Sequence, residues 1–400
     1  MSDQPRTPRT SRRTKIIIIA AIVLVVSAVS TALTWNLRDP FDSGAPRDAS
    51  TQSALDGLVD EGGFPAALAA VTAADGRTTD YTAGVAELGT DKPVPADGLV
   101  RIGSNTKMYT AVVVLQLVDD GLVQLDEPVE SYLPGLLGRY GIDGSTITVR
   151  QLLQHTSGLP NYTTALAATL FTPGDQYMDA REQLDIAFSL PVSFAPGERW
   201  EYSNTNYILA GLLAEKVARQ PIAKLITERI IEPLGLRDTS YPVPGDLSIP
   251  GPHPLGYHAG DDGQLRDITD FDPSLGGAAG QMIASPSDVN RFMRALLGGE
   301  LLTDATLEQM MTTVPADDLW PGSAYGLGLE SFPLTCDALA WGHGGDIPGY
   351  ETRNATIPGG ATATVAVTAL PGGLTTVEDE AIGLATDVYA ALDKALCAAG

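Results

Sequence analysis

Apolar and polar positions divide the chain into an apolar segment near its start, two strand-rich regions and a helical region between them. Short apolar runs predict two strands, 66–71 and 78–85, joined by a turn at Asp75-Gly76. Longer apolar-rich segments bounded by breakers predict helices over 104–118, 207–219, 222–231, 286–297 and 303–311. Strand patterns return at 325–329, 339–343, 350–357 and 361–370, and a last helix is expected over 377–398.

Strands at both ends with helices between them predict an α/β fold with an antiparallel sheet flanked by helices. We expect one folded domain over 53–400, with a helical lobe inserted over about 119–281. Residues 36–52 are polar and contain Pro and Gly, which is typical of a linker.

The start of the chain has the pattern of a membrane-targeting segment. Residues 1–15 are basic, and residues 16–35 carry no charge and would span about 30 Å as a helix. This pattern favours one transmembrane signal-anchor, with 1–15 cytoplasmic and the domain outside the cell membrane. Small residues around 30–32 leave a cleaved signal, and hence a secreted protein, as the alternative.

The charge balance excludes several function classes. The 400 residues carry a formal net charge of −24, and because 1–15 hold five basic side chains and one acid, the remaining 385 carry −28. Nucleic-acid binding needs a basic surface, so it is disfavoured. There is no HExxH, CxxC, P-loop, GxGxxG or GxSxG pattern, and neither a metal nor an organic cofactor is predicted.

The sequence has two cysteines, Cys336 and Cys397. In an exported domain a disulfide between them is favoured over two buried thiols. Such a bridge closes a loop of about 60 residues and would contribute about 4 kcal/mol on the chain-entropy model.

Ser104 and Lys107 form an SxxK motif at the start of a predicted helix. Positions i and i+3 share a helix face, so the lysine reaches the serine hydroxyl and, where desolvated, can accept its proton. The alternative is a serine that only caps the helix, beside a solvated lysine.

Two later motifs supply further candidates. In Tyr202-Ser203-Asn204, a nearby lysine can lower the pKa of the tyrosine enough for it to serve in proton transfer, and Asn204 can hold a substrate carbonyl or orient Lys107. In His343-Gly344-Gly345, expected at the end of a strand, the glycines allow close approach of a substrate. A backbone N–H just after them can complete an oxyanion hole with that of Ser104. His155, beside a glycine turn, is interpreted as structural.

With these three motifs the chain resembles the serine penicillin-recognising family of penicillin-binding proteins, class C β-lactamases and related esterases. The likeness extends over residues 53–400 and includes GSNTK, YLPGLL, ITVRQLLQHTSGL, APGERWEYSNTNY, YGLGL and GHGGDIPGY. It is greatest to actinomycete D-alanyl-D-alanine carboxypeptidases. The resemblance implies a two-lobed β-lactamase/DD-peptidase-like fold with its site between the lobes.

The resemblance also implies residue roles. Ser104 would be the acylated nucleophile, Lys107 and Tyr202 would share proton transfer, and Asn204 would contact the acyl-side amide. His343 would stand where many relatives have the lysine of KTG. The N–H groups of Ser104 and Asp346 would form the oxyanion hole.

Two acids depart from the carboxypeptidase pattern. Glu330 follows GLGL, where an arginine commonly binds the terminal carboxylate of the substrate, and Asp346 belongs to HGGD in place of HTGT. Acids there should repel a carboxylate, unless Arg353 compensates.

We therefore expect an extracytoplasmic serine hydrolase of the D-alanyl-D-alanine carboxypeptidase or penicillin-binding type. Its substrate would be a peptide or a small amide or ester, including a peptidoglycan stem peptide. The alternatives are an esterase or D-amino-acid amidase on the same fold, and a non-catalytic cell-wall binding protein.

Overall fold

The computed structural model describes residues 48–166, 177–243, 245–260 and 262–400. Contacts divide the chain into residues 1–45 and 46–400, and the description below concerns the second unit. The predicted basic segment, the transmembrane segment 16–35 and most of the predicted linker lie outside the described residues. Within the described ranges, no helix combines the length and the apolar character needed to cross a bilayer.

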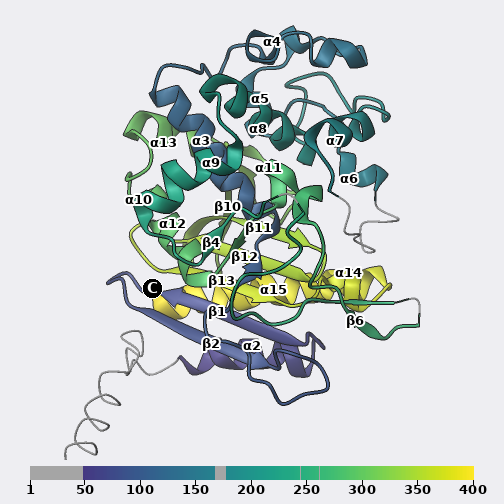
Figure 1. Ribbon diagram of the computed structural model, residues 1–400. Coiled ribbons are helices and arrows are strands. Elements are labelled where there is room, and N and C mark those ends of the chain that lie inside the picture. The colour runs from purple at the N-terminus through teal and green to yellow at the C-terminus, as the bar shows by residue number, and fades with distance from the viewer. Residues whose placement is uncertain (1–47, 167–176, 244, 261) are drawn as a thin grey trace, which may run out of the picture. The chain divides into compact units, whose positions relative to one another are not determined.

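An eight-stranded antiparallel sheet is the centre of the domain (Figure 1). Its strand order is β2-β1-β13-β12-β11-β10-β9-β8, so strands from both ends of the domain meet in it, as predicted. The strands are β1 Ala66–Thr72, β2 Thr78–Gly84, β8 Val314–Pro315, β9 Ala324–Tyr325, β10 Glu330–Pro333, β11 Leu339–Ile347, β12 Tyr350–Thr356 and β13 Thr362–Val367.

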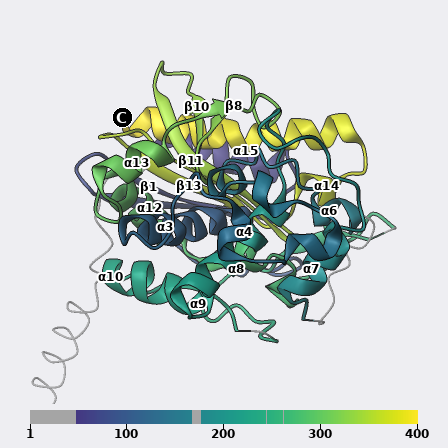
Figure 2. The same ribbon diagram turned by 90° about the horizontal axis from the view of Figure 1, so that it is seen from above.

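Helices cover both faces of this sheet. Helices α2 (Ala49–Asp60) and α15 (Glu378–Ala399) pack on one face, and α12 (Pro286–Leu297) packs on the other. Figure 2 shows α15 on one side of the strands and α12 with α3 on the other. Alternate residues of β1 enter the two cores: Ala67 and Ala69 join the α15 side, and Ala66 and Leu68 join the α12 side. A strand buried on both faces reads as a continuous apolar run, as observed at 66–71.

The core on the α12 side of the sheet extends into a helical region built around α3 (Thr106–Asp119) and α8 (Asn204–Ala218). Both helices are apolar nearly all round, which is the pattern of helices buried inside a domain. The other helices are α4 Val129–Tyr132, α5 Val149–Leu153, α6 Tyr162–Ala165, α7 Ala180–Ala187, α9 Ile222–Ile226, α10 Glu232–Leu234, α11 Gly277–Gly280, α13 Asp304–Met310 and α14 Pro371–Leu374. Short strands β3 Val100–Arg101, β7 Ile283–Ala284 and β4 Thr239–Ser240 form a second sheet, and β5 Tyr257–Ala259 pairs with β6 Leu265–Asp267.

Three local predictions were wrong in ways that matter for function. Residues 326–329 are a turn between β9 and β10 and not a strand, because Gly328 has a positive φ of 81° and Gly326 N–H donates to the Leu329 carbonyl. Strand β11 continues to Ile347, so the HGGD motif lies inside it. The SxxK helix starts at Thr106, and Ser104 belongs to a 3₁₀ turn, Gly103–Asn105, that leads into it. Helix α2 also begins at Ala49, inside the segment assigned to the linker.

Candidate active site

Ser104 and Lys107 are in direct contact at the start of α3. Lys107 Nζ donates to Ser104 Oγ at 2.9 Å, and also to the Asn204 Oδ1 atom at 2.8 Å and the Ala279 carbonyl at 2.8 Å. The lysine side chain is fully buried, and burial holds its pKa well below the ordinary value, although Asp346 and Glu330 oppose that shift. A buried lysine of this kind can exist as a neutral amine beside the serine.

Asn204 orients the lysine. Its Oδ1 atom accepts from Lys107, and its Nδ2 atom donates to Asn161 Oδ1 at 3.3 Å and to Thr163 Oγ1 at 3.2 Å. Both ends of the amide are therefore engaged by protein groups. Of the two uses expected for this side chain, the geometry favours orientation of Lys107.

Tyr202 approaches the serine from the other side. Its phenol is hydrogen-bonded to Ser104, and Lys107 Nζ lies 4.9 Å from the centre of its ring. The expectation of a lowered pKa was wrong, because burial and the nearby carboxylate of Glu330 raise the pKa of Tyr202 well above its ordinary value. The group beside Ser104 is thus a phenol, which can donate a proton, and not a phenolate.

The Tyr202 segment is held in place by His155. The N–H of Ser203 donates to His155 Nδ1 at 3.3 Å, and the amide of Asn206 approaches the same atom at 3.1 Å. The imidazole is buried and packs 4.4 Å from the ring of Tyr202. These contacts agree with a structural role for His155.

Glycines bring β11 against the turn that carries Ser104. A Cβ atom on Gly345 would collide with the Ile102 carbonyl oxygen, and one on Gly103 would lie 2.9 Å from the backbone nitrogen of Asp346. Gly103 also has a positive φ of 48°. The backbones at Ser104 and Asp346 therefore lie side by side, as two N–H donors to one oxyanion require.

His343 and Glu330 form a buried pair in the wall of the pocket. His343 Nδ1 lies 3.5 Å from Glu330 Oε1, and His343 Nε2 lies 2.9 Å from the Tyr325 hydroxyl. Burial lowers the pKa of His343 to about 3, and burial raises the pKa of Glu330 to about 7. The imidazole is neutral at physiological pH, so His343 brings no positive charge to the place where relatives carry a lysine.

Arg353 is held by two acids. Its guanidinium donates to Asp346 Oδ1 at 2.8 Å and lies 2.8 Å from Glu351 Oε1, while the ring of Tyr389 faces it at 4.9 Å. Arg353 therefore compensates the negative charge of Asp346, as considered from the sequence. The same pairing offsets the positive charge of Arg353, so the charges of the two side chains largely cancel.

These side chains surround a single cavity of about 960 Å³. Seven of the residues expected in the site line it: Ser104, Tyr202, Asn204, Glu330, His343, Gly344 and Asp346. Lys107 lies beneath Ser104, and Gly345 faces the 3₁₀ turn. Arg353 also lines the cavity. The arrangement brings together a serine, an adjacent lysine, a phenol and the backbone of Asp346, which are the kinds of group that acyl transfer uses.

Comparison with known proteins agrees with this chemistry. Residues 51–387 match the protein-family model described as beta-lactamase. The chain belongs to the beta-lactamase family. The predicted membership of the penicillin-recognising enzymes is confirmed, and the chain is a serine hydrolase of the beta-lactamase and penicillin-binding protein family.

Relatives within the beta-lactamase family differ in activity. Penicillin-binding protein 4 of Amycolatopsis lactamdurans is 30% identical over 320 residues, covering 78% of each chain. Esterase EstB of Burkholderia gladioli is 31% identical over 275 residues, covering 61% of this chain and 69% of the esterase.

Solved structures add two amidohydrolases. A D-stereospecific amidohydrolase from Streptomyces sp. superposes with a TM-score of 0.75 and 36% identity, covering 84% of this chain and 98% of that one. The D-amino acid amidase from Ochrobactrum anthropi SV3, complexed with L-phenylalanine amide, has a TM-score of 0.74 and 28% identity, covering 87% and 96% of the two chains. The β-lactamase-like fold predicted for the domain is therefore confirmed.

Other residues of this beta-lactamase family site were not identified from the sequence. Asn161 and Thr163 follow the glycine turn after His155 and hold Asn204; their position near that turn was the available signal. Trp320 and Tyr389 line the cavity from segments far along the chain, where no motif marks them. The disulfide between Cys336 and Cys397 is formed, as predicted, with Cα atoms 5.8 Å apart.

Proposed function

We propose that this protein is a D-stereospecific amidohydrolase that works through an acyl-enzyme on Ser104. We further propose that it favours substrates whose leaving side is neutral or cationic. The observation that carries this specificity is the ion pair of Arg353 with Asp346 beside a neutral His343. A substrate carboxylate would meet a cation that is already paired, because Arg353 donates to Asp346.

Acylation begins at Lys107. As a neutral amine it takes the proton of Ser104 Oγ while the oxygen attacks the substrate carbonyl. The resulting oxyanion receives hydrogen bonds from the N–H groups of Ser104 and Asp346. The C–N bond then breaks, and the leaving nitrogen needs a proton.

Tyr202 is the group placed to supply that proton. Its phenol is hydrogen-bonded to Ser104 and carries its proton at neutral pH because its pKa is raised. When the phenol gives its proton to the leaving amine, the ammonium of Lys107 restores it. A water molecule then hydrolyses the ester at Ser104 by the same steps in reverse, and the proton balance closes over one cycle.

The specificity is tested with matched substrates. N-acyl-D-Ala-D-Ala, its C-terminal amide and the corresponding L-enantiomers would be compared by kcat/KM, and the Ser104 adduct would be followed by intact mass. We expect the D-amide to be turned over at least tenfold faster than the free acid, and the L-amide to be a poor substrate. Ser104→Ala should abolish the adduct, and Lys107→Met, which keeps much of the volume, should slow its formation by about 10²–10⁴-fold.

A D-alanyl-D-alanine carboxypeptidase acting on peptidoglycan stem peptides is the second candidate. It is favoured by the likeness to penicillin-binding protein 4 and by the exposure of Asp346, whose side chain is 58% accessible and is free to leave Arg353 when a carboxylate arrives. A clear preference for the free acid in the same experiment would overturn the amidohydrolase proposal in favour of this one. An esterase would instead show faster turnover of D-Ala esters than of either peptide, as the likeness to EstB supports.

A non-catalytic cell-wall binding role is the remaining alternative. It is disfavoured by the direct contact of Lys107 with Ser104 and by the phenol of Tyr202 beside it, because binding alone does not require this arrangement. Absence of any Ser104 adduct with penicillin, activated esters and D-amino-acid amides would support it.

For location, we propose an extracytoplasmic domain attached to the cell membrane by residues 16–35. The uncharged apolar run and its basic flank support this proposal, as does a disulfide in the domain, because disulfides persist in oxidising compartments. Membrane fractionation of the full chain and of a variant lacking residues 1–47 tests it. We expect only the full chain to remain with the membrane.

A further inference from the structure

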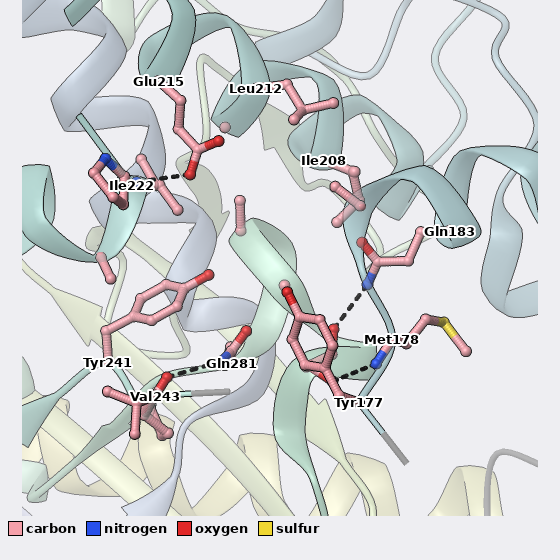
Figure 3. A pocket seen from close by; sticks show the side chains of 18 residues that line it. Tyr177, Met178, Gln183, Ile208, Leu212, Glu215, Ile222, Tyr241, Val243 and Gln281 are labelled. Atoms are coloured by element: carbon pink, nitrogen blue, oxygen red, sulfur yellow. Dashed lines mark hydrogen bonds between the residues drawn. The ribbon is translucent and has the colours of Figure 1, made fainter. Parts of the chain in front are cut away.

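The domain has a second cavity, of about 290 Å³ (Figure 3). Gly277 and Ala278 line this cavity, whereas Ala279 and Gly280 line the cavity of Ser104. The two spaces therefore share α11 as a wall. The volume of this cavity is near the lower end of the range for small-molecule sites, and its walls are mainly apolar, with side chains of α8 and α9 among them.

Two buried glutamine amides present their oxygen atoms, which are hydrogen-bond acceptors, at this cavity. Gln183 uses its Nε2 atom to donate to the carbonyls of Ser274 at 2.8 Å and Leu275 at 3.1 Å, and Gln281 donates from Nε2 to the Pro242 carbonyl at 2.9 Å. Both glutamines are more than nine-tenths buried. Among the described residues, no donor reaches the Oε1 atom of either glutamine, and Figure 3 shows both amides at the cavity wall.

Glu215 gives the cavity its charge. It is the one charged side chain among the described residues that line the cavity, and its Oε1 atom accepts from the N–H of Ile222 at 2.9 Å. Tyr177 and Tyr241 face the same space from two sides. Burial raises the pKa of Tyr241, so it stays a neutral phenol with an aromatic face. A carboxylate, two buried amide oxygens and two aromatic rings together match a cation that has N–H donors and an apolar body.

We propose that this cavity is an accessory binding site for small organic ammonium ions. The ammonium group pairs with Glu215, the amide oxygens of Gln183 and Gln281 offer acceptors and repel anions, and the tyrosines and the aliphatic side chains of Ile208 and Leu212 enclose the apolar part. The inference does not rest on the proposed function, because none of these side chains lines the active-site cavity.

Helix α11 connects this site to Lys107, so binding here would affect the position of the lysine side chain. The carbonyl of Ala279 accepts from Lys107 Nζ at 2.8 Å, and the preceding carbonyl, of Ala278, accepts from Thr110 at 2.7 Å. A ligand packed against Gly277 and Ala278 therefore touches the segment that helps to hold Lys107.

Calorimetry with 2-phenylethylammonium tests the site in the full chain. Its neutral analogue, 2-phenylethanol, and its anionic analogue, 3-phenylpropionate, serve as matched ligands. We expect the ammonium to bind at least tenfold more tightly than the alcohol, and the anion not to bind. Glu215→Gln, which keeps an acceptor for the Ile222 N–H, should weaken ammonium binding at least tenfold.

Two further variants locate the binding. Tyr177 is half exposed, so Tyr177→Leu should fold normally and should weaken binding severalfold. Asp346→Asn, on the active-site side, should leave the affinity unchanged. Equal binding of the alcohol, wild-type affinity in the folded Glu215→Gln protein, or an affinity that falls in Asp346→Asn but not in Glu215→Gln would each overturn the proposal.

Discussion

His343 Nδ1 lies 3.5 Å from the carboxylate of Glu330, and both side chains are almost completely buried. One consequence concerns the pH dependence of stability. Because burial raises the pKa of Glu330 from 4.5 to about 7, the folded protein holds this proton more tightly than the unfolded chain does. The contribution to the free energy of unfolding is complete below pH 4.5 and is lost as the pH rises through about 7.

We therefore expect Glu330→Gln to become more stable relative to wild type as the pH rises from 5 to 8. The pKa shift of Glu330 corresponds to a change of at most about 3 kcal/mol in the difference between the free energies of unfolding of the two proteins. Urea unfolding of both proteins at several pH values measures the difference, and the titration of His343 affects both in the same direction. A difference that does not change with pH would show that Glu330 is not buried as a protonated acid.

The second prediction concerns Asp346 and its partner Arg353. Asp346→Asn keeps the shape of the side chain but removes the charge that neutralises Arg353 toward the cavity. A charge-assisted hydrogen bond is worth about 1.5–3 kcal/mol, so the ratio of kcat/KM for free-acid over amide substrates should rise about 10–100-fold. An unchanged ratio would mean that the ion pair does not determine leaving-side specificity.

The third prediction compares two neighbouring glycines of β11. A Cβ atom on Gly345 would collide with the Ile102 backbone carbonyl, whereas one on Gly344 would lie 3.0 Å from the end of the Arg353 side chain and would not meet the Ser104 turn. Gly345→Ala should therefore displace β11 from the Ser104 turn and slow acylation by about 10²-fold or more, as loss of an oxyanion donor does. Gly344→Ala is the matched control, and its rate of Ser104 acylation should fall much less. Equal losses, measured as rates of adduct formation, would argue against close packing as the reason for Gly345.

The fourth prediction isolates the phenol of Tyr202. Tyr202→Phe keeps the ring that packs on His155 but removes the proton donor beside Ser104. We expect kcat for amides to fall about 10²–10⁴-fold. Esters with acidic leaving groups need less protonation, so their acylation should fall less. A similar loss for both substrates would place Tyr202 at another step.

The sequence predicted most of the elements that carry the site, and it did so where local pattern and tertiary context agree. The apolar run of β1 and the amphipathic helix α12 were found because burial fixes their periodicity. The prediction of a strand over 325–329 was wrong, because these apolar residues are buried in a turn. The turn depends on the positive φ of Gly328, which the hydrophobic pattern does not reveal. A run of apolar letters indicates burial and does not distinguish a strand from a tight turn.

The electrostatics of the site were harder to predict. The SxxK spacing placed Lys107 beside Ser104, but the direction of the Tyr202 pKa shift depends on burial and on Glu330, which lies 128 positions away in the sequence. The pairing of Arg353 with Asp346 depends on the β11–β12 register, in which Gly344 lies opposite Arg353. Trp320 and Tyr389 reach the cavity only through packing of distant segments, for which one sequence holds no signal.

The last prediction concerns the Cys336–Cys397 disulfide, which ties the β10–β11 connection to the end of α15. It closes a loop with a sequence separation of 61 residues, and the chain-entropy model gives a stabilisation of about 4 kcal/mol. The double variant Cys336→Ser, Cys397→Ser should lose that free energy of unfolding in urea, while the rate of Ser104 acylation below the transition stays near wild type because neither cysteine lines the active-site cavity. Reduction of the wild-type protein should reproduce the loss of stability. A double variant as stable as the oxidised protein would show that the unfolded chain gains little freedom when the bridge is absent.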